Sequence, residues 1–233
     1  MENNSTTPVV SNATTVTIPA PNMQIASFVL RGKTHLGVNR FSAKAQTGME
    51  EVQSLGGPAK SRKKRDPKNF QKLFEEAQYR SKEGWAGVNA ACIRLAAISA
   101  CRTVGFKMTL AKLAIFVEPD GFDREDGTPL LRIYGSEPHL WKAPVRNATG
   151  VFDIRPRPRW NPGEWELRPS IRYDAGLFTL VDVTNLVARI GEQVGICEGR
   201  PDSKASAGLG YGLFEVHTRD AEKEQPGKKA KVA

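Results

Sequence analysis

Two helix-forming segments alternate with strand-forming segments along residues 25–217. The second helix-forming segment, TLVDVTNLVARIGEQVG at residues 179–195, repeats apolar residues at helical spacing and places polar residues on the opposite side. Its apolar stripe consists of Leu180, Val183, Leu186, Val187 and Ile190. The first segment, residues 88–103, also has helical spacing and is followed by Gly105, which is typical of a helix end. The sequence therefore predicts two helices separated by strands.

Segments rich in β-branched and aromatic residues surround these helices. We expect strands at residues 25–33 and 211–217, a hairpin made by 114–118 and 129–135, and a second hairpin at 150–174 around the turn NPGE. The order strand, helix, strand pair, helix, strand is that of a ferredoxin-like βαββαβ core. We predict an α+β fold of this type with an inserted β-hairpin.

Composition divides the chain into one domain and several flexible segments. Residues 1–22 and 220–233 contain too few large apolar residues to offset the entropy of ordering, so we expect disordered tails. Residues 54–69 combine turn formers with a basic run that includes Lys63, Lys64 and Arg65, which predicts a flexible basic loop. The interval 23–219 is expected to be a single domain.

The formal net charge of +9 narrows the classes of partner. An excess of Lys and Arg favours polyanions such as nucleic acid, although a basic protein that binds none is the alternative. No apolar run approaches the roughly 20 residues needed to cross a bilayer. The segment MENNSTTPVV lacks the basic start and the apolar stretch that are typical of a secretion signal. We expect a cytoplasmic protein with no membrane partner. The three cysteines and three histidines have no metal-ligand spacing, so neither a disulfide, a metal nor a cofactor is predicted.

The segment RPRPRWNPGEWELRPSIRY at residues 155–173 indicates a binding surface. Successive strand residues point to opposite faces, so Arg155, Arg157 and Arg159 are expected to project together. Arg168 and Arg172 repeat this pattern on the next predicted strand. Like charges on one face are destabilising without an anion, so this row is expected to bind phosphates.

Trp160 lies near the tip of the same predicted hairpin, where it is expected to stack on an exposed base. The alternative interpretation of the hairpin is a solvated polar face, partly balanced by Asp153, Glu164 and Glu166.

The stretch GLGYGLFEV begins with Gly208, Gly210 and Gly212 at alternate positions. A dinucleotide-binding loop leaves a strand and opens a helix, whereas this stretch follows a helix and enters a strand. It is either a turn, or a loop whose missing Cβ atoms let a polymer backbone approach closely.

One histidine is a candidate catalytic residue. His35 follows the first strand beside a basic segment, where a general base for RNA cleavage could lie. Loop histidines are more often structural, so the sequence favours a protein that is not an enzyme.

Several segments resemble a group of uncharacterised phage and prophage proteins. They are VNRFSAKA, YRSKEGWAGVNAACIRLAAISACR, KMTLAKLAIFVEPDG, PVRNATGVFDIRPRPRW, WELRPSIRY and VGICEGRP followed by GLGYGLFEV. The glycine loop before the last strand of a ferredoxin-like order also resembles the RAMP superfamily, the fold group of CRISPR effector backbone and processing proteins. This resemblance implies a subunit that lies along single-stranded nucleic acid, with Asn39, Arg40 and the 208–212 loop against the strand.

The resulting hypothesis is a phage or mobile-element protein that binds single-stranded RNA or DNA through its phosphates, self-associates on the strand and acts in the cytoplasm of a bacterial host. The expected contacts are Asn39, Arg40, Lys63, Lys64, Arg65, Arg146, Arg155, Arg157, Arg159, Trp160, Arg168, Arg172, Gly208, Gly210 and Gly212. Two alternatives stay open: a RAMP-type endoribonuclease with His35 as general base, and an interaction protein that blocks a host defence complex. Phosphate contacts do not distinguish RNA from DNA.

Overall fold

The computed structural model describes residues 18–40, 50, 54, 68–146, 150, 152–203 and 208–218. The tails predicted at 1–22 and 220–233 and the basic loop predicted at 54–69 fall wholly or mostly outside these residues. Lys63, Lys64 and Arg65 therefore lie outside the described residues as well. In the part that is described, no helix has both the length and the apolar character needed to span a membrane.

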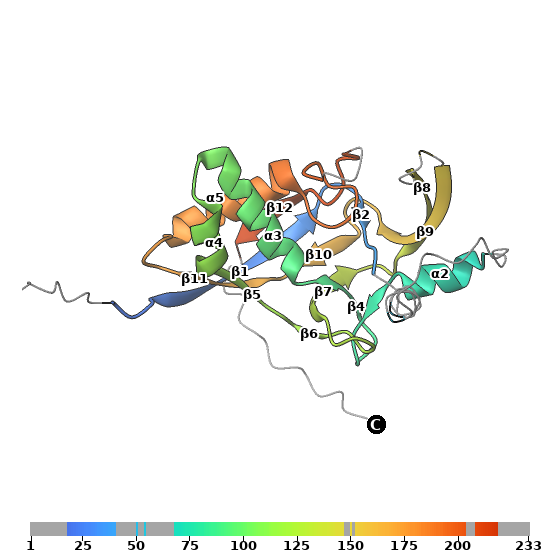
Figure 1. Ribbon diagram of the computed structural model, residues 1–233, viewed down its shortest axis with the longest axis horizontal. Coiled ribbons are helices and arrows are strands. Elements are labelled where there is room, and N and C mark those ends of the chain that lie inside the picture. Colours follow the sequence, from blue (N-terminus) through green and yellow to red (C-terminus); the bar gives the residue numbers. More distant parts are fainter. Residues whose placement is uncertain are drawn as a thin grey trace, which may run out of the picture.

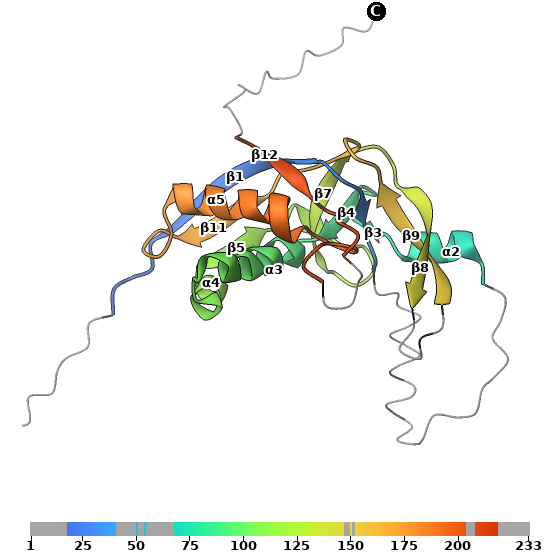
Figure 2. The ribbon, with the colours of Figure 1, turned by 90° about the horizontal axis from the view of Figure 1, so that it is seen from above.

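A curled antiparallel sheet of nine strands forms the body of the molecule (Figures 1 and 2). Its path runs through β3 (Tyr79–Arg80), β4 (Ala86–Asn89), β7 (Pro129–Gly135), β10 (Trp165–Leu167), β1 (Met23–Gly32), β11 (Ser170–Asp174) and β5 (Ile115–Glu118). In addition, β12 (Phe214–Thr218) pairs with β1, and β6 (Gly121–Phe122) pairs with β7. A second, three-stranded sheet has the order β2 (Leu36–Gly37), β9 (Phe152–Trp160) and β8 (His139–Arg146).

Four α-helices occur among the described residues, namely α2 (Phe70–Glu76), α3 (Ala91–Ala100), α4 (Met108–Ala114) and α5 (Leu180–Arg189). A 3₁₀ turn, η1 (Cys101–Val104), extends α3, and a π turn, η2 (Ile190–Val194), extends α5. Figure 2 shows α3, α4 and α5 on one side of the main sheet, whereas α2 lies beside β9. The predicted α+β class is confirmed.

The core lies between the main sheet and the helices α3 and α5. Strand β1 contributes alternate residues to it, among them Phe28 and Leu30. Val183 and Val187 of α5 are buried as predicted, because the apolar stripe of this helix faces the sheet. Leu180, which was predicted to belong to the stripe, is 56% exposed.

The first helix is shorter than predicted. Val88 belongs to strand β4 rather than to the helix, and η1, which extends α3, ends with Gly105 in the left-handed conformation at φ 68°. The buried face of α3 is rich in alanine, which allows the helix to lie close to its neighbours, whereas Leu95 is 60% exposed.

Four adjacent strands at the β5 end of the main sheet follow the order β12-β1-β11-β5, all antiparallel. Helix α3 lies in the chain between β1 and β5, and α5 lies between β11 and β12. Strand β10 extends the pairing along the same edge of β1 as β11. Pro169 separates β10 from β11, and its carbonyl accepts from Phe28 N at 3.1 Å. The remaining strands β3, β4, β6 and β7 continue the sheet beyond β10.

Both predicted hairpins are wrong in their pairing. Strands β5 and β7 do not pair with each other, because β5 pairs with β11 and β7 pairs with β4, β6 and β10. Strand β9 pairs with β8 and β2, not with β10.

Strand β10 is held against β1 by the Trp165 side chain. Trp165 packs flat on Gly32, where a Cβ atom would lie 2.1 Å from the indole, and its Nε1 donates to Thr34 O at 2.8 Å. Burying an indole in this way favours β10 joining β1 over a local hairpin with β9.

Candidate nucleic-acid interface

The arginines of β9 occupy one face of the strand. Pro156, Pro158 and Trp160 are buried on the other face. The prolines do not interrupt the second sheet, because β2 needs only a carbonyl there: Val38 N donates to Pro158 O at 3.0 Å.

Each of the three arginines contacts another side chain of the protein. Arg155 lies 3.7 Å from Asp153, and Arg157 Nε donates to Glu198 at 3.0 Å. The Arg159 guanidinium lies 5.5 Å from the centre of the Trp141 ring, and its buried Nε has no hydrogen-bond partner among the described residues. Burial lowers the pKa of Arg157, Arg155 adds to this decrease and Glu198 opposes it. An added anion would relieve this crowding of positive charge.

Two hollows of about 320 Å³ each meet at Asn39. The first lies between β9 and α2, and its polar lining consists of Asn39, Arg40, Lys68, Glu76, Asp153, Arg155 and Arg157. The second has a polar lining of Asn39, Tyr79, Asn89, Glu198, Gly199, Arg200 and Ser203, together with Cys92 and Cys197. We call them the Asn39 hollows. Because Arg157 lines the first and Glu198 the second, this ion pair lies where the two hollows adjoin.

The glycine loop lies beside β8. Tyr211 of the loop has its ring centre 5.5 Å from that of Trp141 and 5.1 Å from that of His35. Tyr211 N also donates to Gly199 O at 3.1 Å, which ties the loop to the rim of the second hollow.

The three glycines of the loop all have φ between 65° and 71°, a region that L-residues rarely adopt. Their surroundings differ. A Cβ atom on Gly212 would lie 2.1 Å from Ile196 O, whereas one on Gly210 would meet nothing within 4 Å. Gly212 is thus required by backbone packing, while Gly210 leaves its surface open to solvent.

Two predicted contact residues are structural. Arg40 is only 4% exposed, and its guanidinium lies 3.2 Å from the buried Asp123 and 2.7 Å from Glu125. Trp160 is 1% exposed and donates from Nε1 to Ser136 O at 2.9 Å. Trp160 fills the interior, and Arg40 contributes only a small exposed area to the first hollow, so neither presents the exposed side chain that was predicted.

Arg168 and Arg172 are separated from the β9 arginines, because β9 belongs to the second sheet. Arg168 follows β10 and Arg172 lies on β11, both strands of the main sheet. Arg168 stacks on Tyr134 at 4.3 Å, and Arg172 stacks on Phe116 at 4.8 Å and pairs with Glu118 at 2.7 Å. The predicted single row of arginines is therefore two separate groups.

The remaining predicted residues are placed as follows. Asn39 is exposed at the meeting point of the hollows. Arg146 is the last residue of β8 and pairs with Phe152. His35 accepts from Gly212 N at 2.7 Å through its carbonyl, and its Nδ1 is buried without a partner among the described residues.

Sequence reasoning missed Lys68, Trp141 and Arg200. Trp141 lies in HLWKAPVR, whose alternation is compatible with a strand. Pro144 disfavours a central strand, because proline has no N–H to donate to a neighbouring strand. Nothing in the sequence places Lys68 beside β9 or Arg200 in the adjoining second hollow, because both come from distant segments.

The site offers no evident centre for metal or thiol chemistry. No cluster of His, Cys, Asp and Glu that could hold a metal ion occurs within the described ranges. The hydrogen bond with Cys92, together with burial, raises the pKa of the Cys197 thiol well above its ordinary value, so this thiol stays protonated at neutral pH.

No protein-family model matches the chain, and no curated protein matches it.

Proposed function

We propose that this chain binds single-stranded nucleic acid at the Asn39 hollows, with the phosphates along the β9 arginines. The binding is directed at the backbone and carries little sequence preference. We place it in a phage or mobile element, acting in the bacterial cytoplasm as several copies on one strand.

One observation carries this proposal: basic side chains from three separate parts of the chain converge on the Asn39 hollows. Lys68 precedes α2, Arg155 and Arg157 lie on β9, and Arg200 follows η2. Asp153 pairs with Lys68 and Arg155, and Glu198 pairs with Arg157, so three of these four basic side chains share two carboxylate partners and retain capacity for an added anion. Nearby Trp141 and Tyr211 supply aromatic surface of the kind on which bases stack.

We further infer that β12-β1-β11-β5, with α3 and α5, is a ferredoxin-like unit and that the other strands are insertions. The strand order and the position of the two helices support this inference. The glycine loop enters β12, the last strand of that unit, as it does in the RAMP superfamily. By this inference the chain is a RAMP-like strand-binding subunit.

Electrophoretic mobility of labelled single-stranded RNA, single-stranded DNA and duplex DNA tests the proposal. The test variant is Arg155→Gln/Arg157→Gln, in which the glutamine amide at 157 keeps a donor for Glu198. We expect it to bind single strands about tenfold more weakly, because two phosphate contacts are lost. Wild-type protein that binds none of the three would refute the proposal and favour a protein partner.

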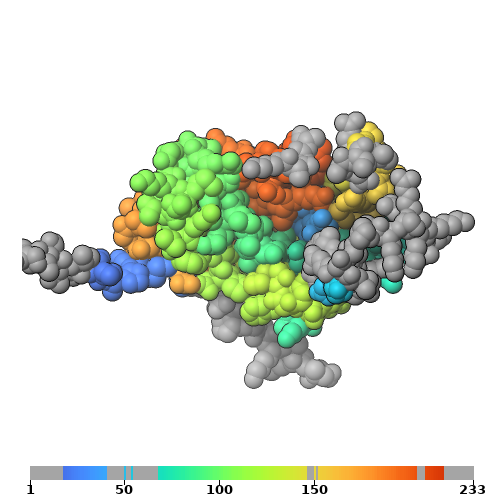
Figure 3. Space-filling view, viewed as in Figure 1, coloured from blue at the N-terminus to red at the C-terminus, as the bar shows by residue number. Residues whose placement is uncertain are grey.

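The matched control is Lys107→Gln/Lys112→Gln, which removes the same charge at α4. Figure 3 shows the green surface of α4 and the yellow surface of β9 at opposite ends of the molecule. Arg168→Gln/Arg172→Gln is expected to behave like this control, since these arginines lie on the main sheet. An equal loss of affinity in all three variants would indicate nonspecific attraction to net charge rather than a site.

A further inference from the structure

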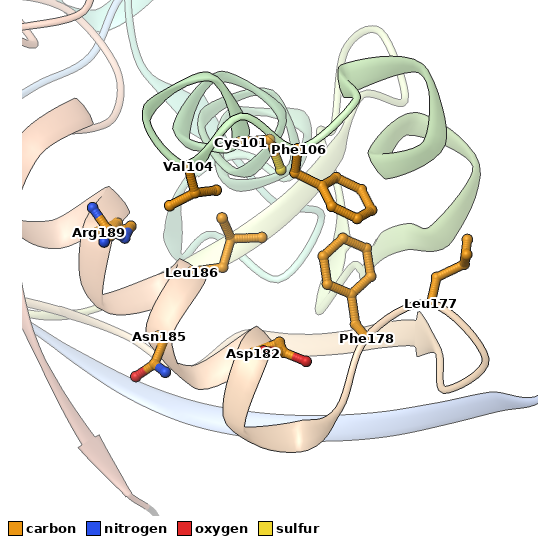
Figure 4. A pocket seen from close by; sticks show the side chains of 9 residues that line it. All are labelled: Cys101, Val104, Phe106, Leu177, Phe178, Asp182, Asn185, Leu186 and Arg189. Carbon is orange, nitrogen blue, oxygen red and sulfur yellow. The ribbon is translucent and has the colours of Figure 1, made fainter.

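An apolar groove lies between α5 and the end of α3, away from the Asn39 hollows. It encloses about 350 Å³, and its apolar walls are formed by Cys101, Val104, Phe106, Leu177, Phe178 and Leu186. Figure 4 shows Phe106 and Phe178 packed against each other at the groove, and their ring centres are 4.7 Å apart. We call it the α5 groove. Val104 and Leu177 are 51% and 43% exposed, so its mouth is apolar and open.

The residues before β1 form an arm that leaves the body of the molecule. Residues 18–22 have the sequence IPAPN, all five are exposed, and Ile18 is 86% exposed (Figures 1 and 3). The arm is attached at its base, where Ala175 N donates to Asn22 O at 2.7 Å. The aliphatic side chain of Ile18 therefore has most of its surface exposed among the described residues.

We propose that the arm of one copy docks in the α5 groove of a second copy, with Ile18 inserted between the groove walls. The chemistry of the two surfaces is complementary. Pro19 and Pro21 lack N–H groups, so the arm presents mainly carbonyl acceptors, and Asn185 and Arg189 supply donors at the groove. The Asp182 carboxylate also lines the groove and accepts hydrogen bonds from Thr179 of its own helix cap. Grooves lined by aromatic side chains are a recurring receptor for extended, proline-rich segments.

The geometry of the arm favours a second copy over its own groove. Ile18 and Ala20 each precede a proline, which holds both in extended conformations, and the prolines have fixed φ. Four such residues project about 12 Å from Asn22 and cannot turn back within that length. Figures 1 and 2 show this segment running away from the domain.

An arm that occupies a groove on the next copy leaves that copy's own arm available for another. Such a contact is heterologous, and it produces an open chain of copies unless the rotation closes a ring. This arrangement does not depend on nucleic-acid binding, so its test contains none. It would supply the self-association that a strand-coating protein needs.

Analytical ultracentrifugation of the full-length chain tests the proposal. The arm variant is Ile18→Asp, and the groove variant is Val104→Asp/Leu177→Asp, at exposed positions whose folding is verified by circular dichroism and thermal melting. Wild-type protein is expected to form assemblies larger than dimers as concentration rises, and each variant is expected to remain monomeric. Ile25→Asp, at a 62% exposed isoleucine on β1, serves as the control and is expected to assemble like wild type.

Mixing the two variants gives the decisive result. The groove of the Ile18→Asp chain is intact, and so is the arm of the groove variant, so the mixture is expected to form a dimer with one copy of each and to stop there. Wild-type protein that stays monomeric at every concentration overturns the proposal, as would docking of the arm within its own chain. Assembly of the Ile18→Asp chain to the wild-type extent, or a mixture that forms no dimer, overturns it as well.

Discussion

Arg40 and Asn39 are neighbours in the chain, yet their side chains have opposite environments. Asn39 is exposed between the two hollows, whereas Arg40 is buried against Asp123. Backbone N–H groups of Glu125 and Arg80 also donate to the Asp123 carboxylate, at 2.9 and 3.2 Å. Arg40 thus connects the segment after β2 to the loop after β6, and of these two neighbours only Asn39 has an exposed side chain.

Replacing Asp123 should therefore destabilise the fold. Asp123→Ala leaves the Arg40 guanidinium buried without its closest buried partner and frees the backbone donors, so we expect the free energy of unfolding to fall by about 3–5 kcal/mol. Urea denaturation measures this change. Glu125→Ala, at a side chain that is 46% exposed, is the control and should cost about 1 kcal/mol or less. Equal effects of the two substitutions would contradict the structural role of Asp123.

Two glycines of the loop should respond differently to alanine. Gly210→Ala places a Cβ atom in open space, so it is expected to cost only the roughly 1–2 kcal/mol of a left-handed L-residue. Gly212→Ala adds a clash with Ile196 O and should cost clearly more. Thermal melting of both variants compares them. If Gly210→Ala were the more destabilising substitution, the loop geometry described here would be wrong.

At the scale of elements, Glu164 connects the end of β9 to the turn between β7 and β8. Its carboxylate accepts from Asn161 N at 3.0 Å and lies 2.8 Å from His139 Nε2, and its carbonyl accepts from Ser136 N at 3.1 Å. The hydrogen bond from Asn161, followed by that from His139, lowers the pKa of Glu164 from 4.5 to about 2.

This lowered pKa predicts a pH dependence of stability. A carboxylate whose pKa is depressed on folding stabilises the protein fully above its unfolded pKa of about 4.5, and that stability is lost as the pH falls toward 2. Glu164→Gln should therefore flatten the fall of the melting temperature over this range. Glu215→Gln, at an exposed carboxylate on β12, is the control. Parallel pH profiles for wild type and Glu164→Gln would contradict the assignment.

Local pattern predicted the elements better than it predicted their partners. The stripe of α5 and the strands around Phe28 and Leu167 follow from periodicity, because periodicity depends only on which face is buried. Pairing depends on contacts between distant residues, such as Trp165 on Gly32, and no local signal contains them. The same limit applies to the site: the β9 arginines could be predicted to share a face, but not that Lys68 lines the same hollow or that Arg200 lines the adjoining one.

Trp160 illustrates the limit for single side chains. A tryptophan at the end of an arginine-rich strand has the same sequence context whether it stacks on a base or fills a core. Its burial is decided by the second sheet and by Ser136, which accepts from its Nε1.

At the scale of the whole molecule, the net charge of +9 is distributed among different surfaces. On the main sheet Arg172 is paired with Glu118, and Arg168 with Glu166 at 2.8 Å. At the Asn39 hollows Lys68 and Arg155 both pair with Asp153, and Arg157 pairs with Glu198, so three basic side chains share two carboxylate partners. We therefore propose that binding lies at one end of the molecule and self-association at the opposite end, where the arm and the α5 groove lie.

The dependence of single-strand affinity on salt tests the central claim most directly. Each phosphate neutralised on a single strand contributes about 0.7 to the slope of log affinity against log salt. Fluorescence anisotropy with a labelled oligonucleotide should therefore give a slope that is shallower by about 1.4 for Arg155→Gln/Arg157→Gln than for wild type. Lys107→Gln/Lys112→Gln should keep the wild-type slope. Equal slopes for all three proteins would contradict a phosphate-binding site on β9.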